Sequence, residues 1–138
     1  MQKKRAAMGS IQPTGKQIQE LAGSADEGPV VMVNMLRFRE KTDAGETGRA
    51  AYERYGRAVA PILNEIGAKV LWLGAVRQVF IGAEKDRWDE VLLVEYPSRK
   101  AFLSMISRPD YKKIHKYRED ALEDSALLAT SSLLPPGR

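Results

Sequence analysis

The sequence predicts an α+β protein with a ferredoxin-like fold, in which two helices cover one face of a four-stranded antiparallel sheet. Segments with strand and helix periodicity follow one another as strand, helix, strand, strand, helix, strand, which is the split βαβ order. The 138 residues suffice for one hydrophobic core but not for two. At 43% hydrophobic and 29% charged, the composition is that of a globular chain.

The N-terminal part of the chain is predicted to lie outside the main domain. Residues 1–13 have the composition of a polar leader, and Thr14 is placed to cap a short helix that runs to Leu21. The stretch from Ala22 to Pro29, rich in glycine, serine and acidic residues, is typical of a linker. The predicted organisation is an extension over 1–29, a main domain over 30–132 and a tail over 133–138.

The main domain begins with an apolar run, Val30 to Phe38, whose valine-rich composition favours a strand with both faces buried. Apolar residues at three- and four-residue steps then predict a helix from Ala50 to Ile66, which Gly67 ends. Pro61 is expected to kink or break this helix because it removes an internal hydrogen bond. Gly56 lowers helix stability by up to ~1 kcal/mol relative to alanine, so we expect another element to approach it closely.

A hairpin and a second helical region complete the predicted domain. A long strand from Lys69 to Gly82 and a strand from Glu90 to Tyr96 flank a polar turn. Ser98 is placed as the N-cap of a helix, and Pro109 interrupts it and suits the first turn of a second helical segment. That segment is predicted over Asp110 to Leu122, and a short last strand over Ser125 to Ser132.

The sheet face away from the helices is also predicted to be apolar. Both alternating phases of the two longest predicted strands contain large hydrophobic side chains. An exposed apolar face of that size indicates a partner. A homodimer that pairs two such faces about a two-fold axis is the simplest solution.

Composition excludes several function classes. The absence of cysteine excludes disulfides, thiolate metal sites and cysteine nucleophiles, and the single histidine, His115, excludes a multi-histidine metal site within one chain. We therefore predict no metal site, and the sequence requires no cofactor. The net charge of +4 is dispersed and no recognition motif is present, which argues against nucleic-acid binding, with the basic stretch Lys112–Lys116 as a weak alternative.

Neither a secretory signal nor an apolar run of the roughly 18 residues that a membrane span needs is found. A soluble, cytoplasmic protein without membrane contact is the resulting expectation. There is also no Gly-rich phosphate loop and no nucleophile-elbow motif.

The last predicted helix contains the most informative polar residues. His115 and Arg118 share an otherwise apolar arc of roughly 100° with Tyr111. His115 is a candidate catalytic acid or base near neutral pH, and Arg118 suits a carboxylate or phosphate. The alternative is that both residues form internal ion pairs with acidic residues of the same chain, for which Asp89, Glu90, Glu95 and Asp124 are available.

Four further residues are candidates for substrate binding: Asn34, Arg37, Tyr55 and Trp72. Asparagine is disfavoured in strands, so Asn34 either pins neighbouring backbone or faces a ligand. Arg37 lies in the opposite phase near the strand end, where it either lines the mouth of a cavity or reaches solvent. Tyr55 and Trp72, with Tyr52, are candidates for an aromatic pocket, although aromatics at such spacing are more often core residues.

Seven segments between about residues 30 and 130 follow a familiar order: Val31–Phe38, Tyr52–Gly56, Val70–Trp72, Trp88–Val91, Tyr96–Arg99, Phe102 and Tyr111–His115. In these segments the chain resembles the DUF1330 family of uncharacterised proteins, which belongs to the dimeric α+β barrel superfamily. The resemblance implies a ferredoxin-like protomer and a dimer whose sheets form a barrel, but no established reaction. Relatives in the superfamily include monooxygenases, decarboxylases, isomerases and stress-responsive proteins, and fold does not fix function. The haem-degrading relatives use an Asn, a Trp and a His, and this chain has Asn34, Trp72 and His115.

We therefore expect a small homodimer with a partly apolar pocket between sheet and helices. The expected ligand is a small organic molecule, either an acid, a carbonyl compound or an aromatic compound. The alternatives are a cofactor-free or haem-dependent monooxygenase and a non-catalytic dimeric stress-response or binding module.

Overall fold

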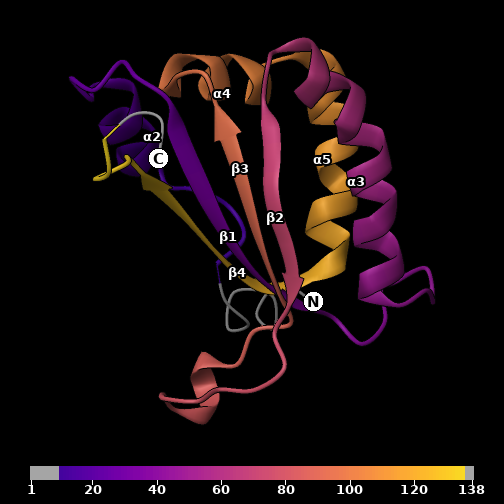
Figure 1. The fold of residues 1–138 in the computed structure, drawn as a ribbon. Coiled ribbons are helices and arrows are strands. Elements are labelled where there is room, and N and C mark those ends of the chain that lie inside the picture. The colour runs from indigo at the N-terminus through magenta and orange to yellow at the C-terminus, as the bar shows by residue number, and fades with distance from the viewer. Residues whose placement is uncertain (1–9, 136–138) are drawn as a thin grey trace.

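The computed structural model describes residues 10–135, in which a four-stranded antiparallel sheet is covered on one face by helices (Figure 1). The strands are β1 (Val30–Phe38), β2 (Lys69–Ala75), β3 (Glu90–Tyr96) and β4 (Leu122–Thr130), and they lie in the order β2-β3-β1-β4. The helices are α2 (Gly15–Ala22), α3 (Gly48–Glu65), α4 (Arg99–Ile106) and α5 (Pro109–Ala121), with a short 3-10 helix η1 (Glu84–Asp86). This is the predicted ferredoxin-like arrangement. Parts of the predicted leader and tail, residues 1–9 and 136–138, lie outside the described residues.

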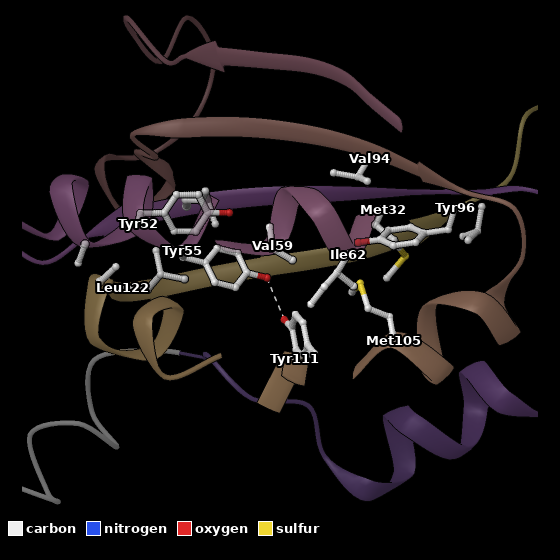
Figure 2. Close-up of a cluster of buried hydrophobic side chains, with 14 residues drawn as sticks. Met32, Tyr52, Tyr55, Val59, Ile62, Val94, Tyr96, Met105, Tyr111 and Leu122 are labelled. Atoms are coloured by element: carbon white, nitrogen blue, oxygen red, sulfur yellow. Dashed lines mark hydrogen bonds between the residues drawn. The ribbon is translucent and has the colours of Figure 1, made fainter. Parts of the chain in front are cut away.

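The core lies between the sheet and the helices. Residues of β1 alternate between buried and half-buried, and the buried set includes Val30, Met32 and Leu36. Met32 is in register with Val94 of β3, so both side chains face the helices. Tyrosines and aliphatic side chains of α3, α4 and α5 complete the cluster (Figure 2). Strand β1 and its neighbour β3 therefore bury their helix-facing side chains against three helices, whereas the side chains of β2 stay exposed.

Strand β2 is shorter than predicted: it ends at Ala75 rather than at Gly82. Ala75 is in register with Glu90, the first residue of β3, so β3 offers no ladder partner beyond it. Residues 76–89 instead form a loop that contains η1 and extends away from the sheet (Figure 1). The apolar residues that suggested a longer strand are exposed there, Phe80 at 86% and Ile81 at 88%.

Strand β4 begins at Leu122, earlier than the predicted Ser125, and directly follows α5. Leu122 is in register with Phe38 after a bulge in the β1–β4 ladder, which extends the pairing toward the helix. The predicted caps are confirmed: Thr14 accepts a hydrogen bond from the Gln17 amide. Ser98 accepts one from the Ala101 amide at 3.0 Å.

Helix α3 is not broken at Pro61, and the close approach expected at Gly56 is wrong. The helix runs without a break through Pro61, whose side chain lies on the exposed face while Val59 and Ile62 on either side are packed in the core. A Cβ added at Gly56 would meet no atom within 4 Å, so no other element approaches it. The close approach occurs instead at Gly48, where a Cβ would lie 2.4 Å from the Arg39 carbonyl oxygen and 2.6 Å from that of Ala121.

Within residues 10–135, no helix combines the length and the apolar character that crossing a membrane would require.

Candidate functional site

The arc of α5 that contains Tyr111, His115 and Arg118 packs against α3, and the two helices lie side by side over the sheet (Figure 1). Tyr111 and Arg118 of α5 are buried and His115 is half-buried. Tyr52 and Tyr55, which are also buried, come from α3. The Tyr55 and Tyr111 hydroxyl oxygens are 2.8 Å apart (Figure 2). The helical period therefore gathers three phenols, one imidazole and one guanidinium at this contact.

A chain of hydrogen bonds connects the buried phenols to the surface. The Tyr111 hydroxyl is 3.2 Å from Nδ1 of His115, and Nε2 of His115 is 3.3 Å from Oε1 of Gln12. The amide nitrogen of Gln12 donates to a carboxylate oxygen of Glu119. Because Gln12 Oε1 only accepts, Nε2 of the imidazole donates, and Nδ1 accepts from Tyr111, which accepts from Tyr55. Hydrogen bonds donated in the order Tyr55, Tyr111, His115 thus reach Gln12 and give every group a partner while His115 is neutral.

Burial sets the protonation states at this site. It lowers the pKa of the His115 imidazole below 6.5; the Glu119 charge opposes this shift and the Arg118 charge adds to it. Burial raises the pKa of Tyr52 to about 12 and that of Tyr55 well above its usual 10.0. The Arg118 charge opposes both of these increases. At neutral pH the site therefore holds uncharged phenols and a neutral imidazole beside one positive charge.

Arg118 is 7% exposed and has no carboxylate partner among residues 10–135. One of its guanidinium nitrogens donates to the backbone carbonyl of Ile11 at 3.4 Å. The internal ion pairs considered from the sequence do not form. Asp124 pairs with Arg37, Glu90 pairs with Arg49, and Asp89 accepts from the Phe38 amide. Glu95 lies in register with Lys69 in the sheet.

Residues Ser10, Ile11 and Gln12 cross the site and are here called the N-terminal strap. Besides the contacts of Ile11 and Gln12, the strap is held by Ser10, whose amide donates to Asp124 Oδ1 at 2.8 Å. The Ser125 hydroxyl donates to the Ser10 carbonyl at 2.6 Å. The strap therefore connects the predicted N-terminal extension to α5 and β4, directly over His115 and Arg118.

The remaining predicted residues lie elsewhere. Asn34 is buried on the helix side of β1, and its side-chain amide donates to the carbonyls of Met32 and Leu92, so it holds neighbouring backbone. Trp72 is 60% exposed and is in register with Leu93, on the face away from the helices. Because Asn34 and Trp72 face opposite sides of the sheet, the Asn, Trp and His of this chain do not form one haem site.

Arg37 is also on the face away from the helices, in register with Asp124. Its guanidinium donates to the carbonyls of Lys85 and Arg87 and lies 5.0 Å from the centroid of the Trp88 ring. Arg37 therefore fastens the loop after β2. A cavity of about 370 Å³ lies in this loop, lined by residues such as Arg77, Gln78 and Trp88, and is separate from the site on α5.

Sequence reasoning placed Tyr111, His115 and Arg118 on one inward face, but it gave Tyr111 no role in the site and missed Gln12. Tyr111 lies four residues before His115, a spacing that puts neighbours on one helix face, so its hydrogen bond was predictable. Gln12 lies 103 residues from His115, and no local pattern signals such a contact. Among the described residues, no group of three or more metal-ligating side chains is present.

The architecture defines a ferredoxin-like α+β domain with a tyrosine-lined polar site between α3 and α5. The chain belongs to the DUF1330 family, whose model, a domain of unknown function, matches residues 45–131. A protein of unknown function from Rhodopseudomonas palustris, known from a crystal structure, is similar to it. The two are 37% identical over 92% of this chain and 99% of that chain, with a TM-score of 0.87.

More distant structures share the fold. A dimeric protein of unknown function from Bacteroides fragilis, with a ferredoxin-like fold, is 13% identical over 77% of this chain and 98% of that chain, with a TM-score of 0.53. A protein from Bacteroides thetaiotaomicron, provisionally described as an antibiotic biosynthesis monooxygenase, is 18% identical over 80% of this chain and 95% of that chain, with a TM-score of 0.52. No curated protein matches the chain.

Proposed function

We propose that this protein binds a small organic molecule between α3 and α5, at the site formed by Tyr55, Tyr111, His115 and Arg118. The observation that supports this most directly is the buried guanidinium without a carboxylate partner, next to a continuous hydrogen-bond chain. Burying a positive charge is costly unless another group compensates for it. A polar ligand group at Arg118 would supply that compensation.

The neighbouring side chains suit a ligand that has both a ring and a polar group. Tyr55 and Tyr111 meet edge to face, with ring centroids 6.3 Å apart, and the Tyr111 ring lies 5.6 Å from that of His115. A neutral imidazole can accept a proton. The ligand would give a proton to the Tyr111 hydroxyl while Tyr111 gives its own proton to Nδ1 of His115, so the phenol stays neutral, the imidazole becomes positively charged and the ligand gains a negative charge. His115 is therefore the acid–base group of the proposed site, and Arg118 is its anchor.

Binding is tested with four small aromatic probes: benzoate, benzamide, benzaldehyde and phenol. Isotope-labelled full-length protein is titrated with each probe and followed by NMR. We expect at least one probe to shift the ring signals of Tyr55, Tyr111 and His115 in a saturable way. A Tyr55→Phe variant, which removes one hydroxyl of the chain, should change the affinity. A Tyr117→Phe variant, altered at a partly exposed tyrosine of α5 that lies outside this hydrogen-bond chain, should not. If none of the probes moves these signals, the proposed site is wrong.

A second copy of this chain is the partner that we propose for the sheet face away from the helices, here called the outer face. Val31, Val33 and Met35 of β1 are half-buried on it, and Trp72 and Leu128 at its edges are 60% and 50% exposed. Both sides of the contact would be the same apolar surface, as a two-fold dimer requires. The Bacteroides fragilis protein with this fold is described as dimeric.

The other two functions considered from the sequence have narrower support. A monooxygenase is supported by the fold shared with the Bacteroides thetaiotaomicron protein, without a gathered Asn, Trp and His set. A non-catalytic binding module would use the same site without proton transfer. The polarised chain through His115 favours a role that includes proton transfer over binding alone.

A further inference from the structure

Arg118 is buried but lies near no carboxylate, unlike the arginines that form ion pairs among residues 10–135. Arg37, Arg49, Arg54, Arg99 and Arg108 each lie within 4.0 Å of a carboxylate oxygen. Even Arg99, whose side chain is 12% exposed, pairs with Asp26 at 3.4 Å. Arg118 is more buried than any of these and has no such partner in residues 10–135. A guanidinium presents paired donors that match the two oxygens of a carboxylate, a fit that one carbonyl oxygen does not provide.

The Arg118 guanidinium has a side-chain hydrogen bond with Tyr52 and a second, weaker contact with the strap. The Ile11 carbonyl lies 3.4 Å from the guanidinium, at the long end of hydrogen-bond distances. Gln12 contacts His115 at 3.3 Å, also a long hydrogen bond. The firmer contacts of the strap are at Ser10, which binds Asp124 and Ser125, and at Gln12, whose side-chain nitrogen donates to Glu119. For the strap to swing away from Arg118 and His115 while Ser10 remains attached, the Gln12–Glu119 bond must break together with the two long bonds.

Resting on the proposed function, we propose that the ligand is a small aromatic carboxylate whose carboxylate replaces the Ile11 carbonyl on Arg118, so that binding displaces the N-terminal strap. The carboxylate would form two parallel bonds with the guanidinium. Its ring would lie against the tyrosines of α3 and α5. Displacing Gln12 would expose Nε2 of His115 to the ligand or to solvent. The strap is thus a cover that an anionic ligand opens.

The ligand class is tested by titration calorimetry of full-length protein with benzoate and with benzamide, which has the same shape without the charge. We expect benzoate to bind at least about 10-fold more tightly, as charge-assisted bonds to a buried guanidinium require. Arg118→Met should abolish this preference. Lys116→Met, on the exposed face of the same helix, should preserve it. Equal binding of benzoate and benzamide would overturn the ligand class, while the proposed site would stand on the NMR shifts.

The strap is tested by backbone NMR relaxation and by loosening its attachment. Benzoate should lower the heteronuclear NOE of the Ile11 and Gln12 amides, because a displaced strap gains mobility, and leave the amides of β1 unchanged. Gln12→Ala, at an exposed residue, removes the bonds to His115 and Glu119 and should tighten benzoate binding about 3- to 10-fold because the open form becomes more populated. Benzoate binding without increased mobility of the strap, or unchanged affinity in Gln12→Ala, would show that the strap is a fixed wall.

Failure of this inference is distinguishable from failure of the proposed function. If benzoate binds neither the wild-type protein nor Gln12→Ala, a carboxylate ligand is excluded. If phenol or benzaldehyde still shifts the signals of Tyr111 and His115, the proposed site survives that result. If no probe does so, both proposals fail.

Discussion

The environment of His115 combines partial burial, a nearby positive charge and two hydrogen-bond partners that suit the neutral ring. Burial is the largest cause of its lowered pKa, and Glu119 is the main opposing influence. The folded protein therefore resists protonation of this imidazole more than the unfolded chain does. The stability that His115 contributes is present above pH 6.5 and is lost as the pH falls through the lower folded-state pKa.

We expect His115→Gln, which does not titrate, to lose less stability than the wild-type protein between pH 7 and pH 5. Urea unfolding at the two pH values measures the difference. The lowered pKa values of Asp26 and Asp110 start from 3.8, so their effects fall below this window. Identical losses in the two proteins would mean that His115 has a normal pKa in the folded state.

At the residue scale, the sequence placed side chains well when a regular period determined their direction. His115 and Arg118 lie on the inward face of α5 because they are three residues apart on a helix whose apolar residues face α3. The partners of these groups were not accessible in the same way. The Ile11 carbonyl reaches Arg118 across 107 positions, and a polar leader offers no periodic signal that would place it.

At the scale of elements, the type and order of the helices and strands were predictable from the sequence, but the residues at which they end were not. The apolar pattern of residues 79–81 continues the alternation of β2, but a strand needs a neighbour for its backbone groups, and β3 starts only at Glu90. The apolar residues 79–81 therefore indicate a surface that a partner could bury, and not a continuation of strand β2. In helix α3 the sequence shows where the glycines are, but it does not show which of them lies against the backbone of another segment.

The two glycines of α3 should respond in opposite ways to alanine. Gly56→Ala adds a methyl group in open space and should stabilise the protein by about 0.5–1 kcal/mol through helix propensity. Gly48→Ala forces a methyl group against the backbone of Arg39 and Ala121 and should destabilise it by roughly 1–3 kcal/mol. Both changes are measured by urea unfolding, with the wild-type protein as reference. A destabilised Gly56→Ala variant would mean that something unseen packs on that position.

At the scale of the whole molecule, β1 and β3 have one face covered by the helices and a second face on which residues 10–135 leave the β1 side chains only half-buried. This two-sidedness was predictable, because large side chains occupy both phases of Val30–Phe38. The loop after β2 adds Phe80 and Ile81, which no periodicity argument had placed at an exposed loop. A partner that covers the outer face would also be near this loop, since both meet at the β2 edge (Figure 1).

If the outer face is a homodimer contact, a single charged substitution on it should lower the molecular mass measured in solution. Val33 lies near the centre of the outer face, in register with Leu93 on one side and Leu128 on the other. We expect Val33→Asp, and at the sheet edge Trp72→Asp, to convert a dimer into a monomer, because an unpaired carboxylate buried between two apolar faces is costly. Ile18→Asp, at an exposed apolar residue of α2, is the matched control and should leave the mass unchanged. Light scattering at micromolar concentration measures each mass, and circular dichroism establishes that the variants are folded.

A wild-type monomer would contradict the dimer directly. A folded dimer of Val33→Asp would instead move the contact away from the outer face, toward the exposed loop after β2.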